Sequence, residues 1–345
     1  MIGVKCINKH IKVYAGLFLT CLCLCGCGSK ESFENPYDGD NTPSAYSVFE
    51  GDFSSVAKPF ASELCVVNEN VNKAGVDVTN TEAAGLFDLT NKEVLYAANV
   101  HRQMNPASLT KVMTALIALE NVKLDETITA TANVNIQEQG AQLCGFQEGD
   151  TFTMDQALYG LLMYSGNDAG VAIAEHVAGS VEAFADMMNE KAKEIGATNT
   201  HFSNPHGLTA ADHYTTAYDL YLIFNEAMKY DKFVEIIHST EYSSVYHDKD
   251  GNEKEIILKT TNQFLSSDSS YTAPEHVTVI GGKTGTTEAA GACLILLSND
   301  AAGNPYISVI LKADDKSVLY TKMTNLLTAI TGNTQNSTQE STQAN

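Results

Sequence analysis

The sequence predicts an α+β fold, in which an antiparallel sheet is built from both ends of the folded region and is flanked by helices with an inserted helical subdomain. Three observations predict it. Strand patterns lie near residues 83–100 and again after about residue 240, helical patterns dominate between about residues 105 and 230, and an amphipathic helix closes the region at 317–330. We expect a cleft where the helical insertion meets the sheet.

The first elements are a hairpin and a helix. Residues 83–100 form two apolar runs around Thr90-Asn91-Lys92, which is typical of a β-hairpin. Residues 105–120, "NPASLTKVMTALIALE", begin with Pro106 near a helix start and place apolar residues at steps of three and four. The apolar positions of this helix are Leu109, Val112, Met113, Leu116 and Ile117.

Further along, Thr153 and Gln156 have the spacing of a helix capping box, and this helix should end before Ser165-Gly166-Asn167. Three strands are then predicted in "VTVIGGKTGTT", "ACLILLS" and "YISVILKA", the last two joined through Gly303-Asn304-Pro305. The closing helix carries one apolar stripe. Its members are Leu319, Met323, Leu326, Leu327 and Ile330.

Length and charge limit the classes of protein. The 345 residues are 44% hydrophobic and 18% charged, which suits one large domain or two small ones. The formal net charge of −21 argues against a nucleic-acid partner, because a phosphate backbone would be repelled.

The N-terminus has the pattern of a secretory signal. Lys5, Lys9 and Lys12 precede an apolar run at residues 13–26, which is too short to span a membrane. The motif "LCGC" at residues 24–27 resembles a bacterial lipoprotein signal, with Cys27 as the lipidated residue. The resemblance implies a signal peptide at 1–26 and a lipid anchor at the outer face of the bacterial cytoplasmic membrane.

The remaining cysteines and both ends of the chain complete the organisation. Cys65, Cys144 and Cys293 have no zinc-binding spacing and are interpreted as buried thiols, with one disulfide left open. Residues 27–55 are polar and suit a flexible spacer, and residues 331–345 suit a disordered tail. The folded domain is therefore expected at 56–330.

Two polar residues interrupt the helix at 105–120. Ser108 and Lys111 are three residues apart, so both side chains leave the first turn on the same side. A neutral amine within hydrogen-bond reach would activate a serine nucleophile. The alternative is an N-cap serine followed by a surface lysine, and Ser55 and Lys58 have the same spacing without a helical stripe behind them.

Two further motifs suggest a shared site. Ser165 and Asn167 flank Gly166 at a turn between helices, where an N-cap serine beside a turn asparagine is the alternative interpretation. Lys283-Thr284-Gly285 lies on a predicted strand, and we expect the glycines around it to let a ligand approach the backbone. Taken alone, this third motif would indicate only a strand with a bulge.

Together, in this order, the three motifs resemble the penicillin-recognising serine acyl enzymes. The segments "NPASLTKVMTAL", "SGNDAGVAIAEH", "FSNPHGL", "YTTAYDL" and "GGKTGTTEAAGACL" are similar to one branch, the low-molecular-mass serine-type D-alanyl-D-alanine carboxypeptidases of peptidase S11 type. The resemblance implies a β-lactamase/penicillin-binding transpeptidase-like fold. It also implies removal of the terminal D-alanine from peptidoglycan stem peptides, with β-lactams as covalent inhibitors and no cofactor.

The resemblance also implies a role for each residue. Ser108 attacks the peptide carbonyl, Lys111 takes its proton, and Ser165 relays a proton to the leaving amine. Burial and the second amine of Lys283 should keep Lys111 neutral. Asn167 holds Lys111 and binds the substrate amide. In the Lys-Thr-Gly motif, which Gly285 completes, Lys283 and Thr284 bind the terminal carboxylate. The N–H groups of Ser108 and Thr286 form the oxyanion hole.

Other functions were weighed against this one. A class A β-lactamase would carry a deacylating glutamate, but residues 197–208 contain no carboxylate. A non-enzymatic penicillin sensor usually carries a transmembrane signalling segment, and the sequence shows none.

His201, His206 and His213 match no common zinc spacing, so we expect structural roles and no metal. Many relatives have a second β-rich domain, but only 60 residues follow Gly285, and a single catalytic domain is expected.

Overall fold

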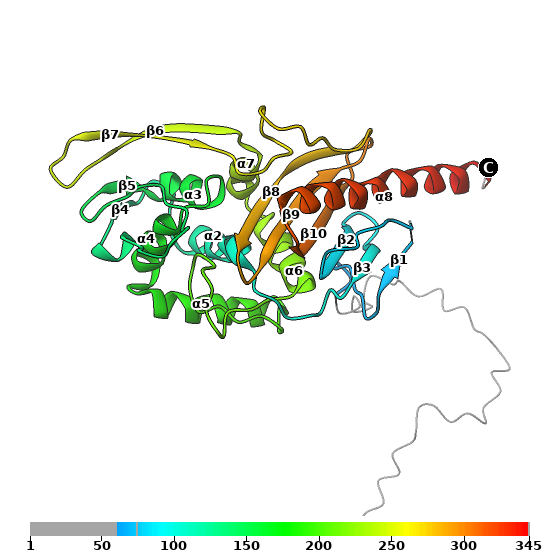
Figure 1. The fold of residues 1–345 in the computed structure, drawn as a ribbon, viewed down its shortest axis with the longest axis horizontal. Helices are drawn as coiled ribbons and strands as arrows, with labels where there is room; N and C mark the ends of the chain where they lie inside the picture. Colours follow the sequence, from blue (N-terminus) through cyan, green and yellow to red (C-terminus); the bar gives the residue numbers. More distant parts are fainter. Residues whose placement is uncertain (1–60, 74, 344–345) are drawn as a thin grey trace, which may run out of the picture. The chain divides into compact units, whose positions relative to one another are not determined.

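The computed structural model describes residues 61–73 and 75–343, which belong to one compact unit, Lys58–Asn345. A six-stranded sheet, with every neighbouring pair antiparallel, has the order β1-β3-β2-β10-β9-β8. The two ends of the folded chain therefore meet in one sheet, as predicted (Figure 1). The strands of this sheet are β1 (Val71–Asn72), β2 (Ala83–Asp88), β3 (Glu93–Ala98), β8 (Thr278–Thr287), β9 (Gly291–Asn299) and β10 (Pro305–Ala313).

Helices lie between the two groups of strands and after the last one. The described helices are α2 (Lys111–Asn121), α3 (Met154–Leu162), α4 (Asn167–Ala178), α5 (Val181–Glu194), α6 (Ala217–Ala227), α7 (Asp231–His238) and α8 (Lys316–Gln343), with short 3-10 helices η2 (Ala107–Thr110) and η3 (Ala132–Val134). This arrangement confirms the predicted α+β fold with a helical insertion.

Both faces of the sheet are buried because its central strands alternate between two hydrophobic clusters. In β9, Leu294 and Leu296 join the cluster that contains α8, whereas Ile295 and Leu297 join the cluster that contains α2 and α6. The predicted stripe of α8 is buried throughout. Its members, Leu319, Met323, Leu326, Leu327 and Ile330, are at most 2% exposed.

The structure also contains elements that the sequence analysis does not name. A second, four-stranded sheet has the order β4-β5-β6-β7 and lies beside the helical insertion (Figure 1). Its strands are β4 (Thr127–Thr129), β5 (Thr151–Thr153), β6 (Glu241–His247) and β7 (Glu253–Lys259). Strands β4 and β5 have three residues each, too few for an alternating pattern to be recognised.

Two predicted boundaries differ from the structure. The helix at 105–120 begins as the 3-10 turn η2, and the α-helix proper starts at Lys111. Helix α8 continues to Gln343, although the sequence predicts a disordered tail from residue 331. A helix that is already nucleated by packing adds further residues at little cost, which explains how its backbone extends beyond the apolar stripe. Among the described residues, no helix is both long and apolar enough to cross a membrane.

Candidate active site

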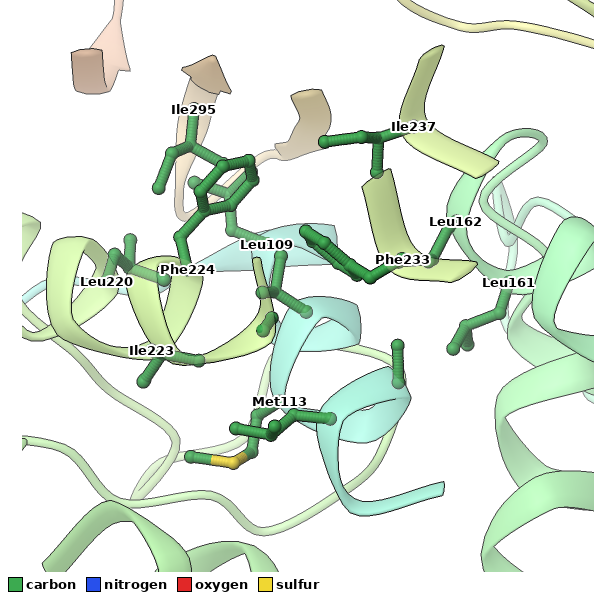
Figure 2. Packing of buried hydrophobic residues seen from close by; sticks show 14 of the residues in the cluster. Leu109, Met113, Leu161, Leu162, Leu220, Ile223, Phe224, Phe233, Ile237 and Ile295 are labelled. Atoms are coloured by element: carbon green, nitrogen blue, oxygen red, sulfur yellow. The ribbon is translucent and has the colours of Figure 1, made fainter. Parts of the chain in front are cut away.

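The turn that carries Ser108 is anchored in the core. Leu109, immediately after the serine, and Met113, one turn further, are fully buried. Figure 2 shows Leu109 between Phe224 of α6 and Phe233 of α7, and Met113 on the side of the helix away from these two rings; all four belong to one buried cluster. Each such buried side chain contributes roughly 1.5–3 kcal/mol, so the core fixes the start of the helix and with it the serine.

The backbone just before Ser108 is strained. Ala107 has φ of +48°, which is unfavourable for a residue with a Cβ. Its carbonyl accepts a hydrogen bond from the Thr110 hydroxyl (2.9 Å), which in turn lies 2.8 Å from His213 Nε2. Burial lowers the pKa of His213 to about 4, so the ring is neutral: Nδ1 accepts from the Ser203 N–H (3.0 Å) and Nε2–H donates to Thr110. Gly207 packs so closely against the Ala107 carbonyl that a Cβ at residue 207 would collide with it.

Lys111 is fully buried and is placed to act on Ser108. Its Nζ lies 2.9 Å from Ser108 Oγ, 2.6 Å from Asn167 Oδ1 and 2.6 Å from the His206 carbonyl oxygen. Burial, assisted by the charge of Lys283, holds the pKa of Lys111 well below its usual range. In the neutral amine, two N–H groups donate to the amide and carbonyl oxygens, and the lone pair remains for the Ser108 hydroxyl.

Ser165 lies on a second strained turn, between α3 and α4. It has φ of +72° and is 7% exposed, and α4 begins two residues later at Asn167. The N–H of Asn167 donates to the Gln142 carbonyl (2.8 Å), and the sulfur of Cys144 packs where a Cβ on Gly166 would collide. The predicted helix break is therefore confirmed, and the capping box of Thr153 and Gln156 is present at the start of α3.

Lys283 connects strand β8 to this turn. Its ammonium donates to Ser165 Oγ (2.9 Å) and to the Thr284 carbonyl (2.8 Å), and the residue is 1% exposed. Burial lowers the pKa of Lys283 to about 7. Two amines and two hydroxyls therefore form two short contacts beside one cavity, one between Lys111 and Ser108 and one between Lys283 and Ser165.

The glycines in β8 allow close approach of the protein's own backbone, and the predicted approach of a ligand stays a prediction, with Gly285 on the wall of the cavity beside Ser108. A Cβ on Gly281 would collide with the Ile237 carbonyl, and one on Gly282 with the Ile295 carbonyl. A Cβ on Gly285 would lie 3.0 Å from the Ser108 nitrogen. These glycines therefore let β8 pack against the protein's own backbone, and Gly285 brings the strand close to the nucleophile turn.

The predicted residues converge on an opening to solvent. A cavity of about 310 Å³ is lined by Ser108, Ser165, Thr284, Gly285 and Thr286. A second hollow of about 780 Å³ also reaches Ser108 and is lined by Asn167 and Thr286. Lys111 and Lys283 contact the lining hydroxyls from beneath. All eight predicted catalytic and substrate-binding residues are thus in one place.

Several neighbours of the site were missed from the sequence. Thr261 Oγ1 lies 2.7 Å from Thr284 Oγ1 and shares its cavity. Asp168, 1% exposed, accepts hydrogen bonds from the N–H groups of Cys144, Gly145 and Phe146 at 2.8–3.1 Å, which holds that loop beside the Ser165 turn. The sequence carried one signal for Asp168, namely its position directly after the Ser-x-Asn motif. A carboxylate that is buried there needs several hydrogen-bond donors around it.

The three histidines have local roles. His201 Nδ1 lies 2.7 Å from the Asp212 carbonyl, His206 Nδ1 accepts from the Leu208 N–H (3.2 Å), and His213 is part of the Ala107 support. In the described part of the chain, no group of three or more metal-binding side chains occurs.

The described cysteines, Cys65, Cys144 and Cys293, are all free thiols. Burial raises the pKa of the Cys293 thiol to about 12. Cys27, the signal at 1–26 and the spacer at 27–55 are predictions from the sequence, and all three lie outside the described residues.

A buried neutral lysine beside a serine hydroxyl, with a second serine–lysine pair at the same open cavity, is the arrangement of a serine acyl enzyme. Comparison with known proteins identifies the branch: residues 70–315 match the family model for peptidase S11, D-alanyl-D-alanine carboxypeptidase. The match covers more than half of the sequence, and the chain belongs to this family.

Individual relatives agree with the family match. The chain is 35% identical over 219 residues to the D-alanyl-D-alanine carboxypeptidase DacF of Bacillus subtilis, covering 62% of this chain and 52% of DacF. It is 31% identical over 279 residues to DacC of Escherichia coli, covering 78% of this chain and 65% of DacC. The chain therefore spans about half to two thirds of the length of these curated relatives.

The structural match confirms the penicillin-binding transpeptidase-like fold. The Streptomyces K15 DD-transpeptidase superposes with a TM-score of 0.66 at 26% identity, covering 76% of this chain and 98% of that chain.

Proposed function

We propose that this chain is a serine-type D-alanyl-D-alanine carboxypeptidase that removes the terminal D-alanine from peptidoglycan stem peptides. The observation that carries the proposal is the 2.9 Å contact between Ser108 Oγ and the buried Lys111 amine, at a cavity shared with Ser165 and Thr284. The family and the printed names of the relatives support the substrate.

In acylation, Ser108 Oγ forms a bond to the carbonyl carbon of the penultimate D-alanine while its proton passes to Lys111. The peptide C–N bond then breaks, and the leaving amine receives a proton through Ser165, which Lys283 contacts. The N–H groups of Ser108 and Thr286 stabilise the oxyanion. Water then attacks the ester: its hydroxyl bonds to the acyl carbon, its proton passes through Ser165 to Lys283, and Lys111 returns its proton to the Ser108 oxygen as the ester bond breaks and the shortened peptide leaves.

Asn167 has a double role in this scheme. Its Oδ1 accepts a hydrogen bond from Lys111 and orients the lone pair of that amine toward Ser108. Its Nδ2 then remains available to the carbonyl of the bound peptide. Thr284, hydrogen-bonded to Thr261, presents a hydroxyl to the terminal carboxylate.

β-Lactams should acylate Ser108 and remain bound, because a deacylating carboxylate is missing from the loop at residues 197–208. Rapid turnover of a penicillin would instead support the alternative of a β-lactamase. Acylation without any peptide hydrolysis would support the alternative of a penicillin sensor.

The activity is tested by incubating the full-length chain with acetylated Lys-D-Ala-D-Ala and measuring free D-alanine. Ser108→Ala should abolish release and should also abolish the mass increase that benzylpenicillin produces. Ser55→Ala, at the other Ser-x-x-Lys of the chain, is the matched control and should change neither. Release that survives in Ser108→Ala would refute the mechanism.

We also propose that the protein is exported and held at the outer face of the cytoplasmic membrane by lipid on Cys27. The "LCGC" motif after a short apolar run supports this localisation. Radioactive palmitate should label the wild-type chain in bacterial cells and should not label Cys27→Ala. Equal labelling of both would contradict the anchor.

A further inference from the structure

Strand β7 is a free edge of the four-stranded sheet. It lies last in the order β4-β5-β6-β7, and the β6–β7 hairpin runs along the margin of the molecule (Figure 1). In the part of the chain that the structure describes, the backbone of Glu253–Lys259 pairs with β6 alone. An unpaired strand edge offers a row of N–H and C=O groups to any further strand that can align with it.

Hydrogen bonds at both ends of the hairpin show which backbone groups face this edge. The Asp248 N–H donates to the Asn252 carbonyl (2.9 Å), and the Thr260 N–H donates to the Thr240 carbonyl (2.9 Å). Hydrogen-bonded pairs alternate along an antiparallel ladder, so every second residue of β7 bonds to β6. The other residues of β7 direct their N–H and C=O groups toward the free edge. They are Glu253, Glu255, Ile257 and Lys259.

The side chains at the edge form a pattern that complements itself when it is reversed. Glu255, Ile257 and Lys259 lie on the exposed face of β7, and the apolar Ile257 is 61% exposed. Charged residues often protect a strand edge from pairing. Here they flank an apolar residue with opposite signs. A second β7 that runs antiparallel about a two-fold axis at Ile257 therefore places Ile257 against itself and Glu255 against Lys259 on both sides.

Neighbouring registers match less well. An axis at Ile256 places Ile257 opposite the carboxylate of Glu255. An axis at Glu255 opposes two like charges, and an axis at Leu258 places Ile257 opposite Lys259. Like charges that are directly opposite destabilise a strand pair, whereas opposite charges and apolar pairs stabilise it. The charge pattern thus selects both the partner, a second copy of this chain, and the register.

We propose that two copies of this chain associate through antiparallel pairing of their β7 strands, with the two-fold axis at Ile257, so that their four-stranded sheets become continuous. Glu255, Ile257 and Lys259 of the two copies exchange about six backbone hydrogen bonds. Because each copy uses the same surface, the contact closes on itself and association stops at the dimer. This inference is independent of the proposed carboxypeptidase activity.

The dimer should be weak and sensitive to charge. One strand pair buries less area than a standard interface of about 1,600 Å². The net charge of −21 also repels a second copy, although salt at 0.15 M screens this repulsion beyond about 8 Å. We therefore expect a dissociation constant on the order of 10–100 μM.

Sedimentation velocity of the full-length chain in a non-ionic detergent, at up to about 200 μM and 0.15 M salt, measures the association. Glu255→Lys and Lys259→Glu should each weaken it at least about fivefold, because each opposes like charges at two places. The double variant exchanges the two charges and should recover wild-type association within about twofold. Lys193→Glu, at an exposed position of α5 with the same change of charge, is the matched control and should associate like wild type.

Cysteine crosslinking tests the register. In a hydrogen-bonded antiparallel pair the Cα atoms are about 5.5 Å apart, a separation that a disulfide accepts. Diamide, which oxidises two thiols to a disulfide, should therefore link Ile257→Cys to itself as a covalent dimer. Val245→Cys, whose position is 48% exposed on β6, is the matched control and should give no more dimer than wild type.

A wild-type chain that stays monomeric at about 200 μM would overturn the proposal. Charge variants that associate like wild type would overturn it too, as would equal crosslinking of Val245→Cys and Ile257→Cys. No residue of β7 lines either hollow beside Ser108, so every variant should release D-alanine at the wild-type rate, which confirms that it is folded. A wild-type chain that dimerises but releases no D-alanine would overturn the proposed function and leave this inference intact.

Discussion

Asp168→Asn should detach the loop at residues 144–146 from the Ser165 turn. Asp168 Oδ1 accepts from the Cys144 N–H, and Oδ2 accepts from the N–H groups of Gly145 and Phe146. An asparagine keeps one acceptor oxygen and turns an NH₂ toward the remaining donors. Two hydrogen bonds to a buried charge are lost from Oδ2, at about 1.5–3 kcal/mol each, so we expect the free energy of unfolding to fall by at least about 3 kcal/mol.

The loop lies beside the catalytic turn, so the substitution should also slow acylation. Urea unfolding measures the free energy of unfolding. The rate at which the protein gains the mass of benzylpenicillin, measured without urea on folded protein, gives the acylation rate. The Asp168 charge raises the pKa of Lys111, so its removal should also move the acid limb of the acylation rate to lower pH. Asp300→Asn is the matched control, because Asp300 accepts from the Ala302 and Asn304 N–H groups in the β9–β10 turn. It should lose stability without losing acylation. A folded Asp168→Asn protein that acylates at the wild-type rate would refute the reasoning.

Three further outcomes are expected. The pKa of Lys283 is about 7 in the folded protein against 10.5 for an ordinary lysine, so the folded state binds fewer protons than the unfolded state between these two pH values. The free energy of unfolding should therefore rise with pH across this window, by up to about 1.4 kcal/mol per pH unit. Urea unfolding at pH 7, 8 and 9 should show a shallower rise of this free energy in Lys283→Met. Gly285→Ala should slow penicillin acylation by at least about tenfold, because its Cβ would lie 3.0 Å from the Ser108 nitrogen, and an unchanged rate would contradict the close approach of β8. Thr261→Val removes the hydroxyl partner of Thr284 and should raise KM for the peptide a few-fold with little change in kcat, which steady-state D-alanine release would measure.

The parts of the fold that could be predicted are those with long local patterns. Strands β9 and β10 have nine residues each and carry mostly apolar runs, and the stripe of α8 repeats over about three turns. Strands β4 and β5 have three residues each and depend on pairing with distant segments. In a strand of three residues, the alternation of apolar and polar side chains repeats too few times to be recognised.

The same division applies to the site. Ser108 and Lys111 are three residues apart, so helical geometry alone brings them together. Ser165 and Lys283 are 118 residues apart, and their contact followed only from the resemblance between the three motifs and a known family. Thr261 belongs to no motif, and the cavity that reveals it exists only after α8 packs on the sheet.

The two turns that present the reacting hydroxyls are both strained. Ala107, just before the nucleophile, and Ser165 itself have positive φ, a conformation that costs roughly 1–3 kcal/mol at each residue with a side chain. Each is surrounded by interactions that offset this cost: the Thr110–His213 pair and buried Leu109 hold the first turn, and the loop fixed by Asp168 packs behind the second. The rigid turns keep Ser108 Oγ 2.9 Å from the Lys111 amine and Ser165 Oγ 2.9 Å from the Lys283 amine. The two serine–lysine pairs are therefore maintained by the surrounding core and loop, and their geometry should be lost first where that support is removed.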